Sequence, residues 1–248
     1  MPIEFKHLRK SFGPKTVLDD VSLEVRDGEC FFVIGGSGVG KSVLIKHLVG
    51  LLRPDHGEIW LDGQEVTKLS ETEFFPVRKK CAMVFQSSTL FDSMTCAENV
   101  ALPLRKHAGL SMKAALELAH ERLEQVHMRT FAGAYPAELG DGMRKRVAIA
   151  RALTLEPRYV LYDEPTTSLD PISARRVDQM IRELCDKTGV TAIVVSHDLT
   201  SIFTIADRIA MLYKGKVQTV GTPDEIKQTQ DPIVRQFIEG RALGPIET

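Results

Sequence analysis

The stretch VIGGSGVGKSVLIKHL, residues 33–48, decides the fold. An apolar run leads into a loop in which Gly35 is followed after four residues by Gly40, Lys41 and Ser42, and a helical pattern begins there. Glycines let backbone N–H groups converge on phosphate oxygens, with the N-terminus of the helix behind them. Lys41 is placed to reach the β- and γ-phosphates, and Ser42 to ligate Mg²⁺. The predicted phosphate-binding loop (P-loop) consists of Gly35, Gly36, Ser37, Gly38, Val39, Gly40, Lys41 and Ser42.

Two other apolar runs end in polar side chains that phosphate chemistry uses. RYVLYDEP carries Asp163 and Glu164, and IVVSHD carries His197. Such nearly unbroken apolar runs are typical of strands buried on both faces of a parallel sheet. Beside a P-loop, Asp163 is placed to contact Mg²⁺ and Glu164 to act as the base that polarises the attacking water. His197 is expected to contact the γ-phosphate, although a lone histidine is more often structural.

Two more residues extend this predicted nucleotide site. Gln86, in MVFQSS, ends another strand-like run, where its amide is suited to ligating Mg²⁺ or positioning water. Phe12 is suited to stacking on an adenine ring, with a place in the hydrophobic core as the equal alternative. Together with the P-loop, these residues predict a site that binds and hydrolyses a nucleoside triphosphate.

Composition and charge limit the classes to which the chain can belong. With 248 residues and 43% apolar residues, it can bury a sizeable core. Lys and Arg number 32 against 33 Asp and Glu, so the net charge of −1 does not favour a nucleic-acid binder. The four cysteines form no C-x-x-C pair and are expected to be reduced thiols. We see no signal peptide and no apolar run near the roughly 18 residues of a membrane helix, so we expect a cytoplasmic protein that reaches a membrane only through a partner.

Strand-like and helical segments alternate along the chain, which indicates an α/β fold. The early segments are expected to form an antiparallel sheet beside the main one, and residues 208–221 a hairpin turning at Lys214 and Gly215. Residues 93–155 are mostly helical and interrupt the strand order, which predicts a helical subdomain. Expected strands lie at 3–12, 21–25, 30–35, 58–63, 80–85, 159–163 and 191–196, and expected helices at 41–51, 112–127, 142–154, 171–188 and 199–206.

The order of these motifs resembles that of the ATP-binding subunit of ATP-binding-cassette (ABC) transporters. The P-loop, Gln86, ELGDGMRKRVAIARAL, LYDEP, SLD and SHD carry the resemblance, which covers essentially the whole chain. It implies a P-loop NTPase (ABC ATPase) with a mixed-sheet core, an antiparallel β subdomain and a helical subdomain at about 93–155, inserted into a single nucleotide-binding domain, 1–248. It also implies a homodimer that clamps two Mg-ATP molecules, each lying between one subunit's P-loop and the other's signature loop.

The resemblance implies a role for each motif residue. The P-loop is the Walker A loop, and Phe12 stands at the usual adenine-stacking aromatic. The remaining roles are Walker B aspartate for Asp163, catalytic glutamate for Glu164, Q-loop glutamine for Gln86, D-loop for residues 168–170 and switch histidine for His197.

A closer resemblance appears in FQSSTLFDSMTCAENVALPLRKH and DPIVRQFIEGRALGP, which look like the ATPase of Mla-type phospholipid transporters associated with MCE-type lipid-binding proteins. It implies an ATPase that powers phospholipid trafficking from the cytoplasmic side of the inner membrane, bound to a permease and indirectly to an MCE protein. Leu90, Phe91 and Met94 are candidates for the permease contact, or they pack inside the helical subdomain. The alternatives are an importer ATPase for a small solute and a regulatory module with low turnover. DNA- or ribosome-acting ABC proteins are disfavoured, because they usually carry two cassettes.

The signature loop departs from the family pattern Leu-Ser-Gly-Gly. This chain has Leu139, Gly140, Asp141 and Gly142, so the serine hydroxyl is missing and a carboxylate replaces the first glycine. A hydroxyl bonded to phosphate contributes about 1.5–3 kcal/mol. A carboxylate about 6 Å from a phosphate charge costs about 3 kcal/mol at an effective dielectric near 20. We therefore expect closure of the dimer on ATP to be impaired, unless nearby cations compensate.

A structural interpretation of Asp141 competes with this one. Aspartate is a favoured helix N-cap, and Asp141 stands just before the helix expected from Gly142. Its carboxylate is also expected to pair with Lys145, four residues on. A capped helix end has fewer free N–H groups for a phosphate, so both interpretations place Asp141 at the position that the ATP of the other subunit would occupy.

Overall fold

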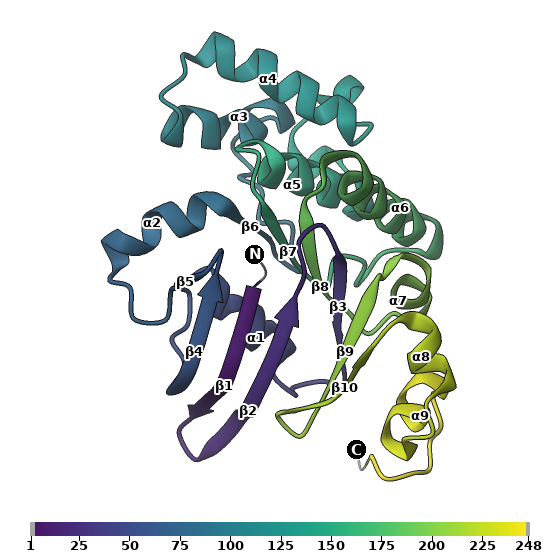
Figure 1. Cartoon of the computed structure of the whole chain (residues 1–248). Coiled ribbons are helices and arrows are strands. Elements are labelled where there is room, and N and C mark those ends of the chain that lie inside the picture. Colours follow the sequence, from purple (N-terminus) through teal and green to yellow (C-terminus); the bar gives the residue numbers. More distant parts are fainter. Residues whose placement is uncertain (1–2, 247–248) are drawn as a thin grey trace.

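Two sheets form the frame of the protein in the computed structural model, which describes residues 3–246 (Figure 1). The larger sheet has the order β10-β9-β3-β8-β7-β6, in which only β10 runs antiparallel to its neighbour. The smaller sheet, β2-β1-β4-β5, is antiparallel throughout. The strands are β1 (Ile3–Phe12), β2 (Lys15–Val25), β3 (Cys30–Ile34), β4 (His56–Leu61), β5 (Gln64–Glu65), β6 (Cys81–Val84), β7 (Tyr159–Asp163), β8 (Thr191–Val195), β9 (Arg208–Tyr213) and β10 (Lys216–Gly221).

The expected P-loop NTPase fold is confirmed, and every expected strand is present. β2 begins six residues before the VSLEV segment that the sequence indicated. The hairpin of β9 and β10 does turn at Lys214 and Gly215, both with positive φ. Because β3, β6, β7 and β8 are parallel, the segments that follow their carboxyl ends meet at one edge of the sheet.

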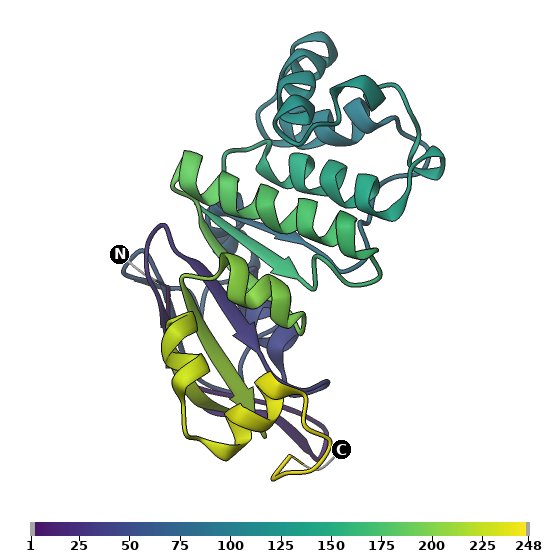
Figure 2. The ribbon, with the colours of Figure 1, turned by 90° about the vertical axis from the view of Figure 1, so that its right-hand side faces the viewer.

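Helices cover both faces of the larger sheet and build a separate group at one end of the molecule. α3, α4 and α5 pack on one another within residues 93–155, at the top of Figure 1, and Figure 2 shows α6 running between this group and the strands. The division into one domain with an inserted subdomain stays a prediction. The helices are α1 (Lys41–Leu48), α2 (Glu71–Lys80), α3 (Cys96–His107), α4 (Met112–Gln125), α5 (Asp141–Leu153), α6 (Pro171–Thr188), α7 (Leu199–Ile205), α8 (Pro223–Gln228) and α9 (Pro232–Glu239), with the 3₁₀ turns η1 (Arg129–Phe131) and η2 (Pro136–Glu138).

Local capping explains where several helices begin. Ser111 caps α4, and Pro171 opens α6 behind the Asp170 cap, as their residue types predict. The sequence interpretation missed α2, α8 and α9 and gave no bounds for α3. α2 and α8 each begin with a capping box, in which a serine or threonine is followed three residues later by glutamate. The boxes pair Ser70 with Glu73 and Thr222 with Glu225.

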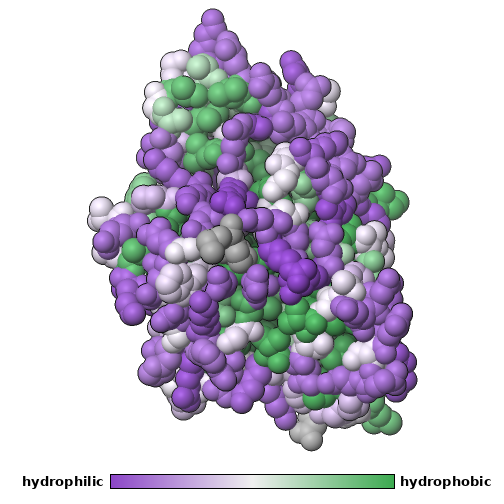
Figure 3. Space-filling model, in the orientation of Figure 1, coloured by the Kyte–Doolittle hydropathy of each residue, from purple (hydrophilic) through white to green (hydrophobic). Residues whose placement is uncertain are grey.

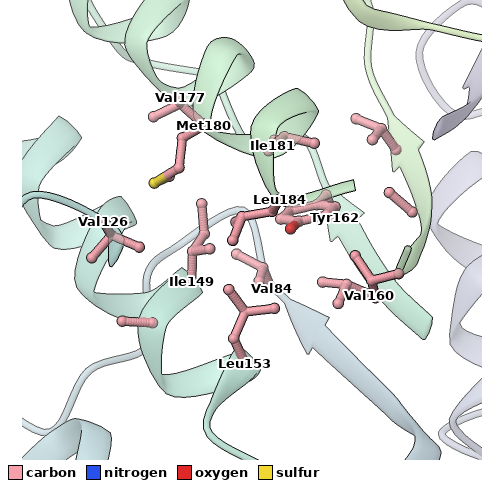
Figure 4. Packing of buried hydrophobic residues seen from close by; sticks show 14 of the residues in the cluster. Val84, Val126, Ile149, Leu153, Val160, Tyr162, Val177, Met180, Ile181 and Leu184 are labelled. Atoms are coloured by element: carbon pink, nitrogen blue, oxygen red, sulfur yellow. The ribbon is translucent and has the colours of Figure 1, made fainter. Parts of the chain in front are cut away.

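Two hydrophobic cores lie on the two faces of the larger sheet. Successive residues of β7 alternate between them: Val160 and Tyr162 face α5 and α6, whereas Tyr159 and Leu161 face the antiparallel sheet and α1. Figure 4 shows Tyr162 packed with Ile149 of α5 and Leu184 of α6, among other apolar side chains. Burial of each such side chain contributes about 1.5–3 kcal/mol. Both faces are covered, so the strands read as continuous apolar runs in the sequence.

The four cysteines are buried and free. Among residues 3–246, no helix combines the length and the apolar character that crossing a membrane requires. Figure 3 shows a mostly hydrophilic face with apolar areas over the group of α3 and α4. The exposed apolar side chains of that part of the chain are Phe91, Met112, Leu118, Phe131 and Tyr135.

Candidate nucleotide-binding site

The P-loop joins β3 to α1 through backbone conformations that require glycine. Gly35 has φ 140° and Gly40 has φ 104°, in the region that other residues rarely adopt. A Cβ at Gly35 would lie 2.3 Å from the Leu212 carbonyl oxygen, and one at Gly40 would lie 2.7 Å from Leu18 Cδ2. The loop is therefore pressed against β2 and β9, and larger side chains at these two positions would displace it.

Lys41 begins α1 with its side chain folded back over the loop. Its Nζ donates to the carbonyl oxygens of Gly35 and Gly36, at 2.9 Å each. Burial lowers the pKa of Lys41, and the carboxylates of Glu164 and Asp163 act in the opposite direction to raise it. The ammonium group thus lies at the centre of the loop, close to the two acidic groups predicted for catalysis.

Ser42 and Asp163 meet across the end of the sheet. The Ser42 hydroxyl donates to Asp163 Oδ1 at 2.5 Å, and Asp163, at the end of β7, is buried. A hydroxyl and a carboxylate oxygen are hard ligands of the kind that Mg²⁺ takes while keeping waters and phosphate oxygens around it. The residues present therefore fit a magnesium ion, with Gln86 exposed at the end of β6 as a third oxygen donor.

Glu164 and His197 form a hydrogen-bonded pair at the same edge. His197 Nδ1 lies 2.8 Å from Glu164 Oε2, and the Thr167 hydroxyl donates to that oxygen at 3.1 Å. Glu164 has φ 52°, and its N–H donates to the Val195 carbonyl at 2.9 Å, which links the end of β7 to the end of β8. A left-handed conformation at a residue other than glycine is costly and is typical of functional sites. The strained backbone holds the carboxylate in one place.

One cavity of about 770 Å³ collects most of the predicted site residues. Phe12 is 47% exposed on its wall, so its alternative as a core residue is wrong, while adenine stacking stays a prediction. The predicted residues that line the cavity are Phe12, Gly35, Gly36, Ser37, Gly38, Gly40, Lys41, Ser42, Gln86, Glu164 and His197. Val39 and Asp163 do not line it.

Sequence reasoning missed three residues that line this cavity: Val17, Val43 and Phe237. Phe237 belongs to α9, and its side chain is partly buried against the core. The signal for it was weak, because DPIVRQFIEG contains no residue type that is specific for nucleotides. The C-terminal segment folds back so that α8 packs on β9 and β10 and α9 packs on α8 (Figure 2). This path brings Phe237 to the cavity that also contains Phe12.

The signature loop lies outside this cavity. Gly140, Asp141 and Gly142 line another cavity, of about 360 Å³, together with Ser168 and other residues between α5 and α6. Gly142 packs closely against α6, since a Cβ there would lie 3.0 Å from the Ser173 side chain. Gly140 has open space around it. Within one chain, the P-loop and the signature loop therefore do not meet.

Two predictions for Asp141 were wrong. α5 begins at Asp141 itself, and Gly140 occupies the cap position without a side-chain hydrogen bond, so Asp141 is not the N-cap. The carboxylate, 62% exposed, pairs with Arg144 and not with Lys145. Three residues on, Arg144 lies on the outer face of the helix, where it also donates to the Leu139 carbonyl at 2.7 Å. Lys145 points inward, where it is buried.

The segment after Gln86 supports both alternatives for its apolar residues. Phe91 is 50% exposed, while Leu90 packs against the core and Met94 is partly buried. Buried Asn99 of α3 holds the segment: its Nδ2 donates to the carbonyls of Phe91 and Met94 at 3.0 Å each, and its Oδ1 accepts from the Phe91 N–H at 2.8 Å. The backbone that presents Phe91 is therefore fixed.

Comparisons with known proteins agree with this geometry. Residues 18–167 match the family model described as "ABC transporter". The intermembrane phospholipid transport system ATP-binding protein MlaF of Haemophilus influenzae is 38% identical over 98% of this chain and 92% of its own length. MlaF of Escherichia coli K12 is 37% identical, over 98% and 91%. A "probable ribonucleotide transport ATP-binding protein", mkl of Mycobacterium tuberculosis, is 36% identical over 98% of this chain and 68% of its own length.

Solved structures are also similar. A dimeric ATP-binding cassette in a post-hydrolysis state, bound to ADP and Pi, superposes with a TM-score of 0.81 at 31% sequence identity. The match covers 89% of this chain and 98% of that chain. A dimer of a bacterial ABC transporter cassette gives a TM-score of 0.82 at the same identity and coverage.

Proposed function

This chain belongs to the ABC transporter family, and from that premise we propose that it is the ATP-hydrolysing subunit of a transporter that moves phospholipids through an inner-membrane permease. The observation that carries the ATPase part is the convergence of Lys41, the Ser42–Asp163 pair and the Glu164–His197 pair on one edge of the sheet. The phospholipid part is supported by the similarity to two MlaF proteins over nearly their whole length.

In this proposal each side chain has one task during hydrolysis. Lys41 exchanges the carbonyls of Gly35 and Gly36 for β- and γ-phosphate oxygens, and the N–H groups of the loop bind the other oxygens. Ser42, Asp163 and Gln86 would hold Mg²⁺, which when bound would neutralise phosphate charge.

Glu164 accepts a proton from the attacking water, in the position that its strained backbone maintains. His197 shares a hydrogen bond with Glu164 and contacts the γ-phosphate. Phe12 stacks on the adenine.

The proposed working unit is a homodimer bound to permease subunits. Because the signature loop and the P-loop of one chain lie in different cavities, a second copy has to supply the signature loop to each ATP. Phe91, exposed on the segment after Gln86, is proposed to contact the permease, which places the subunit on the cytoplasmic side of the inner membrane and links it indirectly to an MCE-type protein. Net charge gives no support for a nucleic-acid partner.

Import of a small solute is the second candidate function. It is supported by the similarity to mkl, whose name refers to ribonucleotide transport, at nearly the same identity as MlaF. A low-turnover regulatory module is supported mainly by the missing hydroxyl at Gly140. The carboxylate gives it less support, since Arg144 already balances the charge of Asp141.

The test is purification of the subunit with its permease and associated substrate-binding protein, followed by mass spectrometry of the bound lipids and an ATPase assay. Phospholipid enrichment, and ATP turnover that Lys41→Ala abolishes, are expected. The Lys41→Ala complex serves as the matched control for lipid that binds without turnover. A complex free of phospholipid that accumulates ribonucleotides in vesicles would instead establish the second candidate.

A further inference from the structure

Lys145 of α5 is a buried cation with no role in the proposed mechanism. It is 2% exposed, and its Nζ donates to the carbonyl oxygens of Phe85 at 3.0 Å and Gln86 at 2.6 Å. Burying an ammonium group is costly unless it is hydrogen-bonded, and here two carbonyl oxygens provide that compensation. Burial lowers the pKa of Lys145 to about 8. The position of the Lys145 side chain therefore depends on its hydrogen bonds to these two backbone carbonyls.

The two carbonyls belong to the point where β6 ends and the segment carrying Gln86 begins. Lys145 itself lies one turn after the signature loop, which forms the start of α5. A second side chain of the same helix, Arg151, donates to the carbonyl and the hydroxyl of Thr89 at 3.0 and 3.1 Å. α5 thus holds the backbone of residues 85–89 at two places.

Space next to this contact would allow the segment to move if it were released. A cavity of about 560 Å³ separates residues 86–90 from Ser168 and from the start of α5, and Lys145 lines it together with Asp141 and Arg144. Residues 86–90 form neither helix nor strand, so ladder hydrogen bonds do not hold them. The side-chain contacts from α5 therefore help to determine where the Gln86 backbone lies, between the end of β6 and the Asn99 contacts at Phe91.

We propose that Lys145 is a positioning residue for hydrolysis, which ties Gln86 to the signature helix so that the two respond to ATP together. The inference rests on the proposed ATPase function and on the second copy that completes each site. Gln86 lines the cavity that contains the P-loop, whereas the start of α5 lines a different cavity, where the ATP of the proposed second copy would bind. The contact carries a change at Gln86 to the loop that must close on the second ATP.

Lys145→Met tests this proposal, because methionine has a similar length and no donor. We expect kcat to fall at least tenfold while the Kd for ATP, measured on the isolated subunit, stays within twofold. Lys145→Gln keeps N–H donors and is expected to retain most of the turnover. The matched control is Lys187→Met on α6, whose ammonium is exposed and pairs with Glu183. An unchanged kcat in folded Lys145→Met, or a loss in Lys145→Gln equal to that in Lys145→Met, overturns the proposal.

A double-mutant cycle separates positioning through Gln86 from a general loss of packing. In a Gln86→Ala background, Lys145→Met is expected to lower kcat by less than twofold further, since the group that it positions is already gone. Full additivity overturns the proposal. If the wild-type complex and Lys187→Met also lack turnover, the proposed function fails, which is a different result from an active wild type that Lys145→Met leaves unaffected.

Hydrogen exchange on the wild type gives a measurement that does not depend on whether the variant folds. Amides of residues 86–89 and of the first turn of α5 are expected to change protection at the same Mg-ATP concentration, and not at all in Lys41→Ala. A response of only one of the two segments overturns the proposal.

Discussion

At the scale of single residues, the site depends on pairs and not on isolated groups. Lys41 binds the loop carbonyls, Ser42 binds Asp163, and Glu164 binds His197. In each pair, the polar groups already bind one another at the positions where they would bind ATP, Mg²⁺ or water. Nucleotide binding is therefore expected to exchange one set of hydrogen-bond partners for another.

Lys41→Ala is expected to abolish ATP binding without unfolding the protein. The ammonium group donates to two carbonyls of the loop and lies outside the hydrophobic core, so its loss removes a phosphate ligand and little apolar packing. Nucleotide affinity by isothermal titration and the thermal midpoint by circular dichroism give the two readings. A folded variant that binds ATP normally would contradict the role of Lys41.

Substitutions in the signature loop are expected to show that the missing hydroxyl matters more than the added charge. A Cβ at Gly140 meets nothing within 4 Å, so Gly140→Ser is accommodated and restores a phosphate ligand worth about 1.5–3 kcal/mol. We expect it to raise ATP turnover about tenfold, a change of about 1.4 kcal/mol. Asp141→Gly is expected to do less, because Arg144 already balances the carboxylate.

ATP turnover of wild type, both single variants and the double variant, each with the permease, measures these effects. A larger gain from Asp141→Gly than from Gly140→Ser would show that Arg144 does not compensate the charge. No gain from any variant would mean that the loop closes through other contacts.

At the scale of elements, the C-terminal helices complete a site that the P-loop begins. α9 is fixed to β10 by Gln218, whose Nε2 donates to the Asp231 side chain at 2.6 Å, and Asp231 also caps the helix. This anchoring places Phe237 in the same cavity as Phe12. Phe12, Phe237 and Val17 are apolar side chains that line this cavity, and apolar surface of this kind suits a purine base.

Phe237→Ala is expected to weaken ATP binding about 2- to 10-fold, since an aromatic contact is worth about 0.5–1.5 kcal/mol beyond its buried area. The matched control is Phe203→Ala on α7, whose ring is also partly buried against the same core but does not line the cavity. Titration with a fluorescent ATP analogue measures both. Equal weakening in the two variants would trace the effect to lost packing and not to contact with the base.

Asp178 of α6 is expected to make the free energy of unfolding depend on pH. The side chain is buried, accepts from the Ser201 hydroxyl of α7 at 2.8 Å and lies 3.0 Å from Arg175. Burial raises its pKa to about 6 despite these partners. The folded protein therefore binds this proton more tightly than the unfolded chain, so the stabilisation is complete below the unfolded pKa and is lost as pH rises through about 6.

Urea unfolding at pH 5 and pH 8 is expected to show the difference between wild type and Asp178→Asn. From pH 5 to pH 8, the unfolding free energy of the wild type should fall by about 1.4 kcal/mol more than that of the variant. Equal pH slopes for the two proteins would show that Asp178 stays ionised throughout this range.

At the scale of the whole molecule, one chain carries a P-loop and a signature loop that belong to two different sites. The P-loop cavity opens at the edge of the larger sheet, and the signature loop lines another cavity at the start of α5. Closure of two copies is the proposed event that joins the halves. The free energy of that closure includes the contact with a signature loop that has Gly140 in place of the serine.

Glu164→Gln is expected to form an ATP-dependent dimer poorly, because removal of the base prevents hydrolysis but leaves a signature loop that lacks the serine hydroxyl. Adding Gly140→Ser to Glu164→Gln is expected to give a stable dimer. Analytical ultracentrifugation with and without Mg-ATP compares the two proteins. A stable dimer of Glu164→Gln alone would mean that closure is not impaired.

The sequence by itself determined the family, the P-loop and the placement of Asp163, Glu164, Gln86 and His197 at strand ends. This was possible because those roles depend on residue types at short spacings, and because buried parallel strands read as apolar runs. The capping boxes of α2 and α8 were readable in the same local way and were overlooked.

Only the tertiary structure decided what depends on contacts between distant segments. It brought Phe237 to the cavity of Phe12, turned Lys145 inward onto Gln86, and paired Asp141 with Arg144. A spacing of three or four residues allows either Arg144 or Lys145 to reach Asp141, so spacing alone does not decide between them, and the prediction of Lys145 was wrong. The packing of α5 against β6 settled it, because the carbonyls of Phe85 and Gln86, about 60 residues away in the chain, needed a donor that only the inward lysine supplies.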